Sequence, residues 1–304
     1  MRILVTGGAG FIGSHVAETF LQAGHEVVII DNLSTGLEEN IPPGAKFVAG
    51  DITDRSLVKS LFTEHKFDVI NHHAAQMNIR VSVADPVLDA RVNILGTIEL
   101  LRQSIRTGVD KFMFASTGGA VYGEQTSFPA DENHAANPIS PYGVSKLAGE
   151  KYIHYYSREY GLPYCILRYA NVYGPRQNPN GEAGVVAIFS SLLASGKPAT
   201  INGDGRQTRD YVYVGDVVAA NLAGLGAKDN LTINVGTGIE TDVLTVYEHL
   251  RQAAHSDLAP RHGPAKPGEQ IRSVIDPRLA REILGWEPGI ALPEGLSRTY
   301  QSFL

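Results

Sequence analysis

Tyr142 and Lys146 are the two residues whose types and spacing most directly suggest chemistry. They lie four positions apart in the segment SPYGVSKLAGEKYIHYYSREYG. On a helix, side chains with this spacing share one face, so the ammonium group would stand beside the phenol. A free tyrosine titrates near about 10, and a neighbouring cation favours the phenolate and brings it toward the range of a general base. The alternative is a tyrosine and a lysine that merely share the exposed face of a surface helix.

A polar stretch, ASTGGAVYG, places Ser116 and Thr117 directly after the apolar run KFMFA. A pair of hydroxyls at the end of a buried strand could form a turn, or it could hold a hydroxyl group of a substrate. The residues that follow, Gly118, Gly119 and Ala120, have no side chain that can move a proton. Any chemistry in this stretch therefore depends on the two hydroxyls.

Three glycines in the segment VTGGAGFIGSH have the spacing G-x-x-G-x-x-G, between a predicted strand and a predicted helix. Gly7, Gly10 and Gly13 would allow a tight turn and a close approach of the backbone to a pyrophosphate. Free amides at the start of the helix, at Phe11 and Ile12, would face the anion. The alternative is a glycine-rich turn without a ligand.

Asp31 supports a dinucleotide site, because it ends the next apolar run, EVVIID, eighteen residues after Gly13. A carboxylate at this place accepts hydrogen bonds from ribose hydroxyls and repels a 2′-phosphate, which favours NAD over NADP. Asn32 follows in the same site, and no arginine is present there to bind such a phosphate. Asp51 and Ile52, at the end of the third run, are placed to frame the adenine. For Asp51, capping of the helix predicted at TDRSL is an equal alternative.

The composition limits the classes of function. Of the 304 residues, 43% are hydrophobic and 19% are charged, so the chain can bury a core. The net charge of −6 comes from interspersed acids and bases without a basic stripe, which argues against a nucleic-acid partner. Cys165 is the single cysteine and lies in the apolar run PYCILRY, so we expect a buried thiol and a cytoplasmic protein. We expect neither a signal peptide nor a membrane span, because the apolar runs are too short.

Adjacent histidines, His72 and His73, follow the fourth apolar run. Adjacent residues of a strand point to opposite faces, and no second pair of ligands has metal-binding spacing. We therefore predict no metal site and expect both rings to lie in the core or beside the cofactor.

The elements that must position these residues alternate along the chain. Short apolar runs rich in β-branched residues cover 2–7, 26–31, 46–51, 68–74, 111–116 and 164–171. Segments with helical spacing lie between most of them. This pattern predicts an α/β fold, a Rossmann-type doubly wound parallel sheet covered on both faces, with a smaller C-terminal α/β lobe for the substrate.

The texture changes after residue 173, where segments rich in Gly, Pro and Asn flank the apolar segment VVAIFSSLLASG. We predict an NAD-binding domain over 1–172, to which the chain returns at about 210–238. The lobe for the substrate would comprise 173–209 and 239–304. Two short helices are expected around DPRLAREILGW and LPEGLSRTYQSF.

Five segments, TGGAGFIG, ASTGGAVYG, YGVSK, LRYANVYGPRQ and RDYVYVGDV, together resemble the extended short-chain dehydrogenase/reductase family, and within it the bacterial UDP-glucose (UDP-galactose) 4-epimerases. They occur in the order of the family and span essentially the whole chain. The resemblance implies a tightly bound NAD, a UDP-sugar substrate held by the smaller lobe, and a homodimer. The dimer would pair the helices near 85–107 and 142–159 of each subunit.

The resemblance also implies roles for single residues. Tyr142 would be the catalytic acid/base, and Lys146 its electrostatic partner and a ligand of the nicotinamide ribose. Thr117 would be the catalytic hydroxyl, with Ser116 as the fallback. Asn93 would match an asparagine of the family beside the cofactor, with a purely structural role as an equal alternative. The further residues implied at the cofactor are Ala74, Ala75, Gln76 and Tyr169.

On the substrate side, the resemblance implies that Asn171 contacts the nucleotide sugar and that Arg209 binds its diphosphate. An ion pair with Asp210 is the alternative for Arg209. Lys266 takes a position where the family usually has an arginine for the diphosphate. Ser273 takes a gate position where a small residue would admit an N-acetyl group, which predicts turnover of UDP-GlcNAc and UDP-GalNAc beside UDP-glucose and UDP-galactose.

The function so predicted is NAD-dependent 4-epimerisation of a UDP-hexose through a transient 4-keto intermediate. Dehydratases and decarboxylating relatives resemble this chain but carry an acid after the Ser/Thr pair, where this chain has Gly118, Gly119 and Ala120. A UDP-glucuronate 4-epimerase or another nucleotide-sugar enzyme of the family is the nearest alternative. From a different class, the chain could be an NAD(H)-sensing module without turnover, against which the intact Tyr142 and Lys146 argue.

Overall fold

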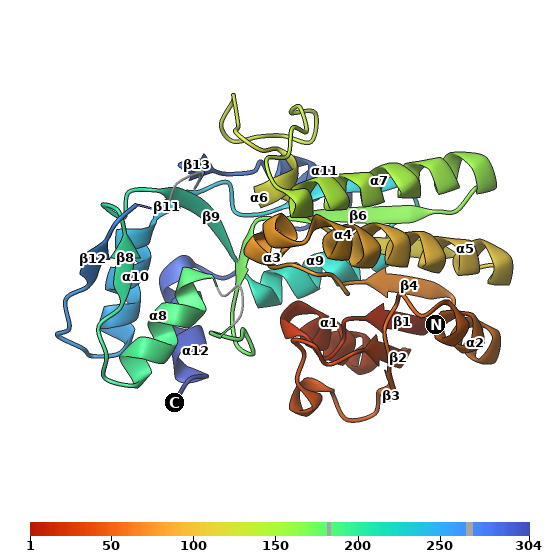
Figure 1. Ribbon diagram of the computed structural model, residues 1–304, viewed down its shortest axis with the longest axis horizontal. Coiled ribbons are helices and arrows are strands. Elements are labelled where there is room, and N and C mark those ends of the chain that lie inside the picture. Colours follow the sequence, from red (N-terminus) through yellow and green to blue (C-terminus); the bar gives the residue numbers. More distant parts are fainter. Residues whose placement is uncertain (181–183, 266–269) are drawn as a thin grey trace.

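The computed structural model describes residues 1–180, 184–265 and 270–304. Its larger part is a seven-stranded sheet in the order β10-β6-β5-β4-β1-β2-β3, in which every neighbouring pair is parallel (Figure 1). This confirms the predicted doubly wound sheet. Its strands are β1 (Arg2–Thr6), β2 (Glu26–Asp31), β3 (Lys46–Ala49), β4 (Val69–His72), β5 (Lys111–Thr117), β6 (Tyr164–Tyr169) and β10 (Leu231–Val235).

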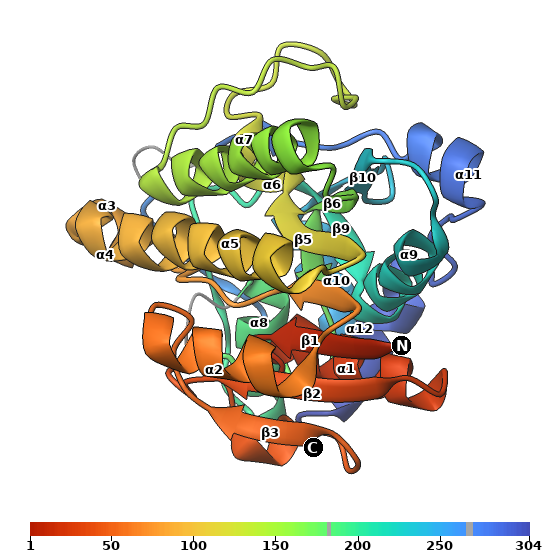
Figure 2. The same ribbon diagram turned by 90° about the vertical axis from the view of Figure 1, so that its right-hand side faces the viewer.

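Helices cover both faces of this sheet, as the apolar character of its strands requires. On one face, α1 (Phe11–Gln22) packs against α9 (Val214–Gly226). The other face is covered by α2 (Arg55–His65), α5 (Thr97–Thr107) and α7 (Pro141–Tyr160). Helix α5 packs against both α2 and α7, and α5 and α7 run side by side (Figure 2). A separate apolar cluster fills the space under each layer, with Val16 and Phe20 on the α1 side and Leu100 and Phe112 on the α5 side.

Local sequence signals set the ends of the helices that carry the candidate residues. Helix α7 begins after Ser140, whose hydroxyl accepts a hydrogen bond from the Gly143 amide at 3.2 Å, and Pro141 occupies its first turn. It ends at Gly161, which has a left-handed backbone conformation (φ 72°). The position of Tyr142 on the first turn is therefore fixed by a cap, a proline and the spacing between them.

The chain between β4 and α5 is almost continuously helical. It comprises α3 (Ile79–Ala84), α4 (Pro86–Ala90) and the π-helix η2 (Arg91–Gly96), which leads directly into α5. Shorter helical turns are η1 (Glu38–Asn40) and α6 (Gly118–Val121), the latter directly after β5. Across the three described ranges, no helix combines the length and the apolar character that crossing a bilayer would take.

A smaller lobe lies beyond the carboxyl ends of the large sheet's strands, at the left of Figure 1. Strand β9 (Thr208–Tyr213) pairs there with β7 (Asn171–Tyr173), β11 (Glu240–Asp242) and β13 (Arg272–Ser273). A two-stranded sheet joins β8 (Thr200–Asn202) to β12 (Arg261–Gly263). Helices α8 (Val185–Ala194), α10 (Val243–Ala253) and α12 (Leu292–Gln301) pack with these strands around a core of their own.

The return of the chain to the large sheet is made by α9 and β10. Strand β10 pairs with β6, and α9 packs on α1. The sequence predicts the return at about 210; β9, up to Tyr213, pairs with β7, β11 and β13, and the first element that packs on the large sheet's own layers is α9. Both β9 and β10 are short strands, and only their pairing with other strands decides to which sheet each belongs. The predicted tail helices correspond to α11 (Arg278–Leu284) and α12.

Candidate active site

The glycine turn has the shape that a dinucleotide site needs. Gly7 has a φ of +70°, and a Cβ at this position would lie 2.7 Å from the backbone nitrogen of Ala74. A Cβ on Gly13 would collide with the carbonyl oxygen of Gly7. Helix α1 then begins at Phe11, directly after Gly10, without an acidic residue in its first turn. The backbone cradle and the free helix N-terminus therefore fit a pyrophosphate.

Asp31 lies at the mouth of this turn with its carboxylate already anchored. Oδ2 accepts a hydrogen bond from the Ala9 amide at 3.0 Å, and Oδ1 accepts one from the Leu33 amide at 2.8 Å. A carboxylate oxygen has two lone pairs, so each oxygen can still accept from a ribose hydroxyl. The carboxylate is thus held in place by two backbone amides beside the glycine turn.

Asp51 and Asn32 are joined by a hydrogen bond from Asn32 Nδ2 to Asp51 Oδ2 at 2.7 Å. Burial alone would raise the pKa of Asp51, but hydrogen bonds from Thr53 and Asn32 outweigh it and hold the pKa below its ordinary value. The N-cap of α2 is Asp54, which accepts from the amides of Ser56 and Leu57. The alternative that Asp51 caps this helix is therefore wrong, and Asp51 stands beside Asn32 at the end of the sheet.

The segment after β4 is held by two sets of contacts. The Ala74 amide donates to Thr6 Oγ1 at 3.0 Å. Asn93, in the π-helix η2, donates from Nδ2 to the Gln76 carbonyl at 2.8 Å and accepts the Gln76 amide at 2.9 Å. Both ends of the Asn93 amide are thus used to fix the backbone of Gln76, which is the structural role left open above. Ala75 lies between these two anchored residues and is half-buried.

Tyr142 and Lys146 share one face of α7, as the spacing predicts. Lys146 Nζ lies 5.9 Å from the centre of the Tyr142 ring and donates to the Ala115 carbonyl at 2.9 Å. Burial lowers the pKa of Lys146 to about 8, against the attraction of Asp89 and Glu150. Burial, together with the charge of Asp89, raises the pKa of Tyr142. Because the raised pKa makes the Tyr142 phenolate unfavourable, a cation beside the phenol is needed to stabilise it.

The two hydroxyls at the end of β5 have different surroundings. Ser116 is 3% exposed and donates from Oγ to Glu150 Oε1 at 2.6 Å. Glu150 also accepts two hydrogen bonds from Arg168, at 2.9 and 2.6 Å. Thr117 is half-buried, and its hydroxyl has no hydrogen-bond partner in the described part of the chain. Thr117 is thus the hydroxyl that remains available to a ligand, and Ser116 is part of a buried network.

Of the five predicted substrate residues, Thr117 ends β5, and Asn171, Arg209 and Ser273 lie in strands of the smaller lobe. Asn171 lies in β7 opposite Tyr211, and Arg209 lies in β9 opposite Ser273 of β13. Ser273 is buried. The neighbouring Asp210 points to the other face of β9 and accepts hydrogen bonds from Thr237 and Gly238. Lys266 lies outside the described residues.

Asp89 is a buried polar residue that sequence reasoning missed. Its carboxylate accepts from Asn93 Nδ2 and Gln76 Nε2, each at 3.1 Å, and from the hydroxyl of Ser145 on α7. It thereby ties the segment after β4 to the helix that carries Tyr142. An acid four residues before Asn93, among the apolar residues of PVLDARVNIL, is the signal in the sequence that could have indicated it.

The tyrosine predicted at the cofactor, Tyr169, is buried at the end of β6. Its hydroxyl accepts from Asn221 Nδ2 at 2.8 Å and lies 3.2 Å from His73 Nε2. The hydroxyl is therefore occupied by protein groups. His72 and His73 point to opposite faces of the sheet, since His72 contacts Thr97 of α5. In the described ranges, no group of three His, Cys, Asp or Glu side chains is arranged to hold a metal ion.

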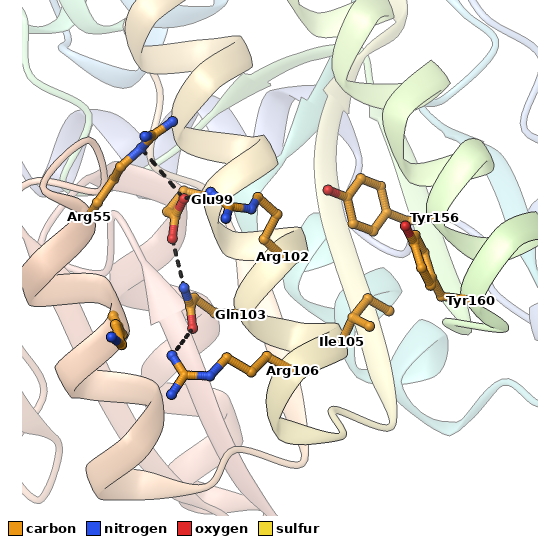
Figure 3. A pocket seen from close by; sticks show the side chains of 9 residues that line it. Arg55, Glu99, Arg102, Gln103, Ile105, Arg106, Tyr156 and Tyr160 are labelled. Atoms are coloured by element: carbon orange, nitrogen blue, oxygen red, sulfur yellow. Dashed lines mark hydrogen bonds and ion pairs between the residues drawn. The ribbon is translucent and has the colours of Figure 1, made fainter.

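A surface hollow between α2, α5 and α7 contains none of these residues (Figure 3). At its centre the buried Glu99 accepts from Arg102 at 2.9 Å and from Gln103 at 2.7 Å, and Arg55 Nε lies 3.7 Å away. Tyr156 lines its other side. Arg55 and Arg102 interact here with the buried carboxylate of Glu99. This hollow is therefore distinct from the candidate site.

Known proteins resemble this chain over essentially its whole length. Residues 3–236 match the model of the NAD dependent epimerase/dehydratase family. A putative UDP-glucose 4-epimerase of Methanocaldococcus jannaschii is 48% identical over 97% of this chain and 96% of its own. The UDP-glucose 4-epimerase of Thermotoga maritima, solved with UDP-glucose, has a TM-score of 0.98 at 47% identity and covers 100% of this chain and 98% of its own. That of Thermus thermophilus, solved with NAD, has a TM-score of 0.94 at 45% identity over 100% and 99% of the two chains.

Proposed function

The chain belongs to the NAD dependent epimerase/dehydratase family, and from this premise we propose that it catalyses the 4-epimerisation of a UDP-hexose, interconverting UDP-glucose and UDP-galactose. The observation that carries the proposal is the placement of Tyr142, Lys146 and Thr117 around the carboxyl ends of β5 and β6, beyond the glycine turn. The enzyme is an isomerase of the UDP-glucose 4-epimerase type and uses NAD.

The residues of the turn fit NAD, because the cradle formed by Gly7 and Gly13 leaves no room for a side chain and Asp31 keeps free lone pairs for a ribose. When bound, NAD supplies a reversible acceptor for the hydride at C4 of the sugar. Tyr142 takes the proton of the 4-hydroxyl as that carbon is oxidised and returns it when the ketone is reduced on its other face. Lys146 stabilises the phenolate, and Thr117 donates a hydrogen bond to the 4-oxygen.

The residues beyond Thr117 argue for epimerisation and against elimination. Gly118, Gly119 and Ala120 form the start of α6, next to the reaction centre. Expelling water from C5 and C6 of the sugar needs an acid and a base in addition to Tyr142. These three residues provide neither, and the 4-keto intermediate can only be reduced again.

On the substrate side we place the diphosphate at Arg209 and the nucleotide sugar at Asn171. The UDP-sugar lobe would comprise residues 173–209 and 239–304, together with residues 171–172 and 210–213, which complete β7 and β9. Arg209 suits a diphosphate, because its guanidinium can bind two oxygens at once. The small, buried Ser273 stands opposite Arg209 in the register of β9 and β13 and would leave room for an N-acetyl group. UDP-GlcNAc is accordingly a further substrate, and UDP-glucuronate is the alternative.

We place the enzyme in the cytoplasm, in galactose metabolism, as a homodimer. The free and buried Cys165 suits a reducing compartment. The segment from α3 to η2 and helix α7 expose a row of large apolar side chains on the outside of the molecule, which a second copy would cover. The row comprises Val83, Val87, Leu95, Val144, Tyr152 and Tyr155, which are 40 to 67% exposed.

Proton NMR of the sugar anomeric signals tests this function. The protein is incubated separately with UDP-galactose, UDP-GlcNAc and UDP-glucuronate. New anomeric signals without a change in mass mean epimerisation, whereas loss of 18 Da, the approximate mass of one water, means elimination. No turnover of any of the three would contradict the proposal and favour an NAD(H)-sensing module.

Tyr142→Phe provides the matched variant for this experiment. It removes the hydroxyl that moves the proton and leaves the ring in place, so we expect turnover to fall by about 10²–10⁴-fold. NAD retention, read from the absorbance and mass of the purified protein, should stay as in the wild type. Unchanged turnover in this variant would remove Tyr142 from the mechanism.

A further inference from the structure

A chain of buried hydrogen bonds runs under the candidate site and ends on His73. Its first member, Asn221, is fixed in orientation because its Nδ2 lies 2.9 Å from the Val217 carbonyl, which can only accept. The same Nδ2 lies 2.8 Å from the hydroxyl oxygen of Tyr169. Both hydrogens of this amide nitrogen are therefore used, and Tyr169 is an acceptor toward Asn221.

The orientation of Asn221 also decides where the proton of Tyr169 goes. The hydroxyl has one proton to donate, and the nearest remaining group is Nε2 of His73, at 3.2 Å. The two rings are stacked, with centroids 6.1 Å apart and an interplanar angle of 20°. If Nε2 carried the hydrogen instead, the buried Tyr169 proton would have no acceptor, at a cost in free energy that proteins rarely accept. Nε2 is thus the acceptor, and the ring hydrogen of His73 is on Nδ1.

The Nδ1 atom of His73 is buried and has no hydrogen-bond partner among the described residues. The adjacent His72 is different, because its Nδ1 lies 2.7 Å from Thr6 Oγ1 and its Nε2 lies 2.9 Å from Thr97 Oγ1. Two consecutive histidines therefore have opposite characters. His72 is a satisfied residue of the core, and His73 presents a donor without an acceptor.

The backbone of His73 lies directly against the glycine turn. Its backbone amide donates to the Thr6 carbonyl at 3.1 Å, and a Cβ on Gly7 would lie 3.0 Å from its carbonyl carbon. On its other side, the charge of Lys146 is close enough to act on the ring. Burial, with this charge, lowers the pKa of His73 to about 3, so the ring is neutral at any working pH. A neutral ring is thus attached to the backbone that borders the glycine turn and lies within reach of the charge of Lys146.

We propose that His73 Nδ1–H donates a hydrogen bond to an oxygen of bound NAD, and that Tyr169 and Asn221 are positioning residues that fix the ring in this tautomer. The proposal rests on the proposed function only through NAD binding. It changes the interpretation of Tyr169, which acts on the cofactor through His73 and not through its own hydroxyl.

The tautomer can be read directly by ¹⁵N NMR of histidine-labelled protein. The chain has 10 histidines, and comparison with His73→Phe assigns the signal. We expect the pattern of a neutral ring protonated at Nδ1 in the protein without NAD, and a downfield shift of that proton when NAD is added. Tyr169→Phe should let the ring change to a mixture of tautomers. A ring protonated at Nε2 in the wild type would overturn the proposal.

NAD affinity gives the second test, independent of turnover. His73→Phe keeps a stacked ring without the donor and should weaken NAD binding about three- to tenfold, as the loss of one hydrogen bond does. His73→Asn restores a donor near the place of Nδ1 and should recover most of the affinity. His25→Phe, in the turn between α1 and β2, is the matched control and should bind NAD like the wild type.

ADP-ribose, which lacks the nicotinamide ring, locates the acceptor. Weakening of both ligands by His73→Phe places the acceptor on the pyrophosphate or ribose, and weakening of NAD alone places it on the carboxamide. Wild-type affinity for NAD in His73→Phe would overturn the proposal. Failure of the wild type itself to bind NAD would instead overturn the proposed function.

Discussion

At the scale of residues, Ser116 and Thr117 show how two adjacent hydroxyls acquire different roles. Successive residues of a strand face opposite sides, so only one of them can meet α7 at the level of Glu150. Ser116 does so and donates to that carboxylate, while Thr117 ends the strand with a free hydroxyl. The buried carboxylate of Glu150 thus distinguishes the two hydroxyls, and we propose Thr117 as the catalytic one.

We predict that Thr117→Ala lowers kcat by about 10- to 100-fold, because one hydrogen bond to the reacting oxygen is lost. Thr117→Ser should keep most of the activity. Ser116→Ala, the matched control, should lower the free energy of unfolding by about 1 kcal/mol and leave kcat near that of the wild type. Steady-state kinetics and urea unfolding check both parts, and the opposite order of effects would make Ser116 the catalytic hydroxyl.

Lys146 combines a role in the site with a cost in stability. Its pKa falls from 10.5 to about 8 on folding because the charge is buried, which corresponds to about 3 kcal/mol of destabilisation at neutral pH. This destabilisation has its full size below pH 8, where Lys146 is protonated in both the folded and the unfolded state. It shrinks between about 8 and 10.5, because there the unfolded state binds the proton and the folded state does not.

Lys146→Met should therefore abolish turnover and yet raise the free energy of unfolding at pH 7, by up to about 3 kcal/mol. The gain should diminish as the pH rises toward 10. Urea unfolding of both proteins at several pH values measures it. A variant that is less stable than the wild type at pH 7 would show that the contacts of Lys146 outweigh its burial.

At the scale of elements, helix α7 is fixed to the sheet by a buried ion pair. Glu150 is fully buried on this helix and pairs with Arg168 of β6, whose side chain is 7% exposed. Arg168 continues to Tyr122 at 2.9 Å, and Tyr122 donates to Asn234 of β10 at 2.7 Å. One network thus ties α7 to β5, β6 and β10, and it holds the helix that carries Tyr142 and Lys146 in its place.

Glu150→Gln should destabilise the protein by about 3–5 kcal/mol, since it leaves the guanidinium buried without its counter-charge and turns an amide N–H₂ toward it. The matched control is Glu294→Gln. Its ion pair with Arg298 is about half exposed and contributes little, so a change within about 0.5 kcal/mol is expected. Equal midpoints of urea unfolding for the two variants would contradict a central role of the network.

Many of the helices and strands could be predicted from the sequence. There is a physical reason why the other features could not. The runs at 26–31 and 111–116 correspond to β2 and β5 almost residue for residue, because parallel strands buried on both faces are continuous apolar segments. The sequence could not assign β9 to its sheet, nor show that Asn93 and Asp89 hold the segment after β4. These depend on contacts between residues far apart in the chain, which no local pattern records.

At the scale of the whole molecule, the candidate site lies where two separately packed parts meet. The glycine turn, Thr117 and Asp31 stand at the carboxyl ends of the parallel strands, where ligands of such sheets bind. Arg209 and Ser273 lie in the smaller sheet, which has its own core beyond those ends (Figure 1). The chain crosses between the two parts more than once, so cofactor and sugar residues are held by one continuous structure.

The exposed apolar row on α3 to η2 and on α7 leads to the prediction for the assembly. Leu95 is 56% exposed in η2, on the outside of the helix layer that carries Tyr142. If a second copy covers this face, Leu95→Glu buries one charge from each subunit in an apolar interface, where it cannot be solvated. We expect this variant to sediment as a monomer at micromolar concentration, and the wild type to sediment as a dimer.

Leu222→Glu is the control, because Leu222 is 40% exposed on α9, on the opposite side of the sheet. It should leave the dimer intact. The far-ultraviolet circular dichroism of both variants should match that of the wild type, so that a loss of assembly is not mistaken for a loss of fold. A wild type that sediments as a monomer, or a Leu95→Glu variant that remains a dimer, would show that this apolar row makes a different contact.

Loss of the dimer should also weaken NAD binding. The hydrogen bonds of Asp89 with Ser145 and Gln76 join this helix layer directly to the segment after β4, so we expect a monomeric variant to hold NAD less firmly.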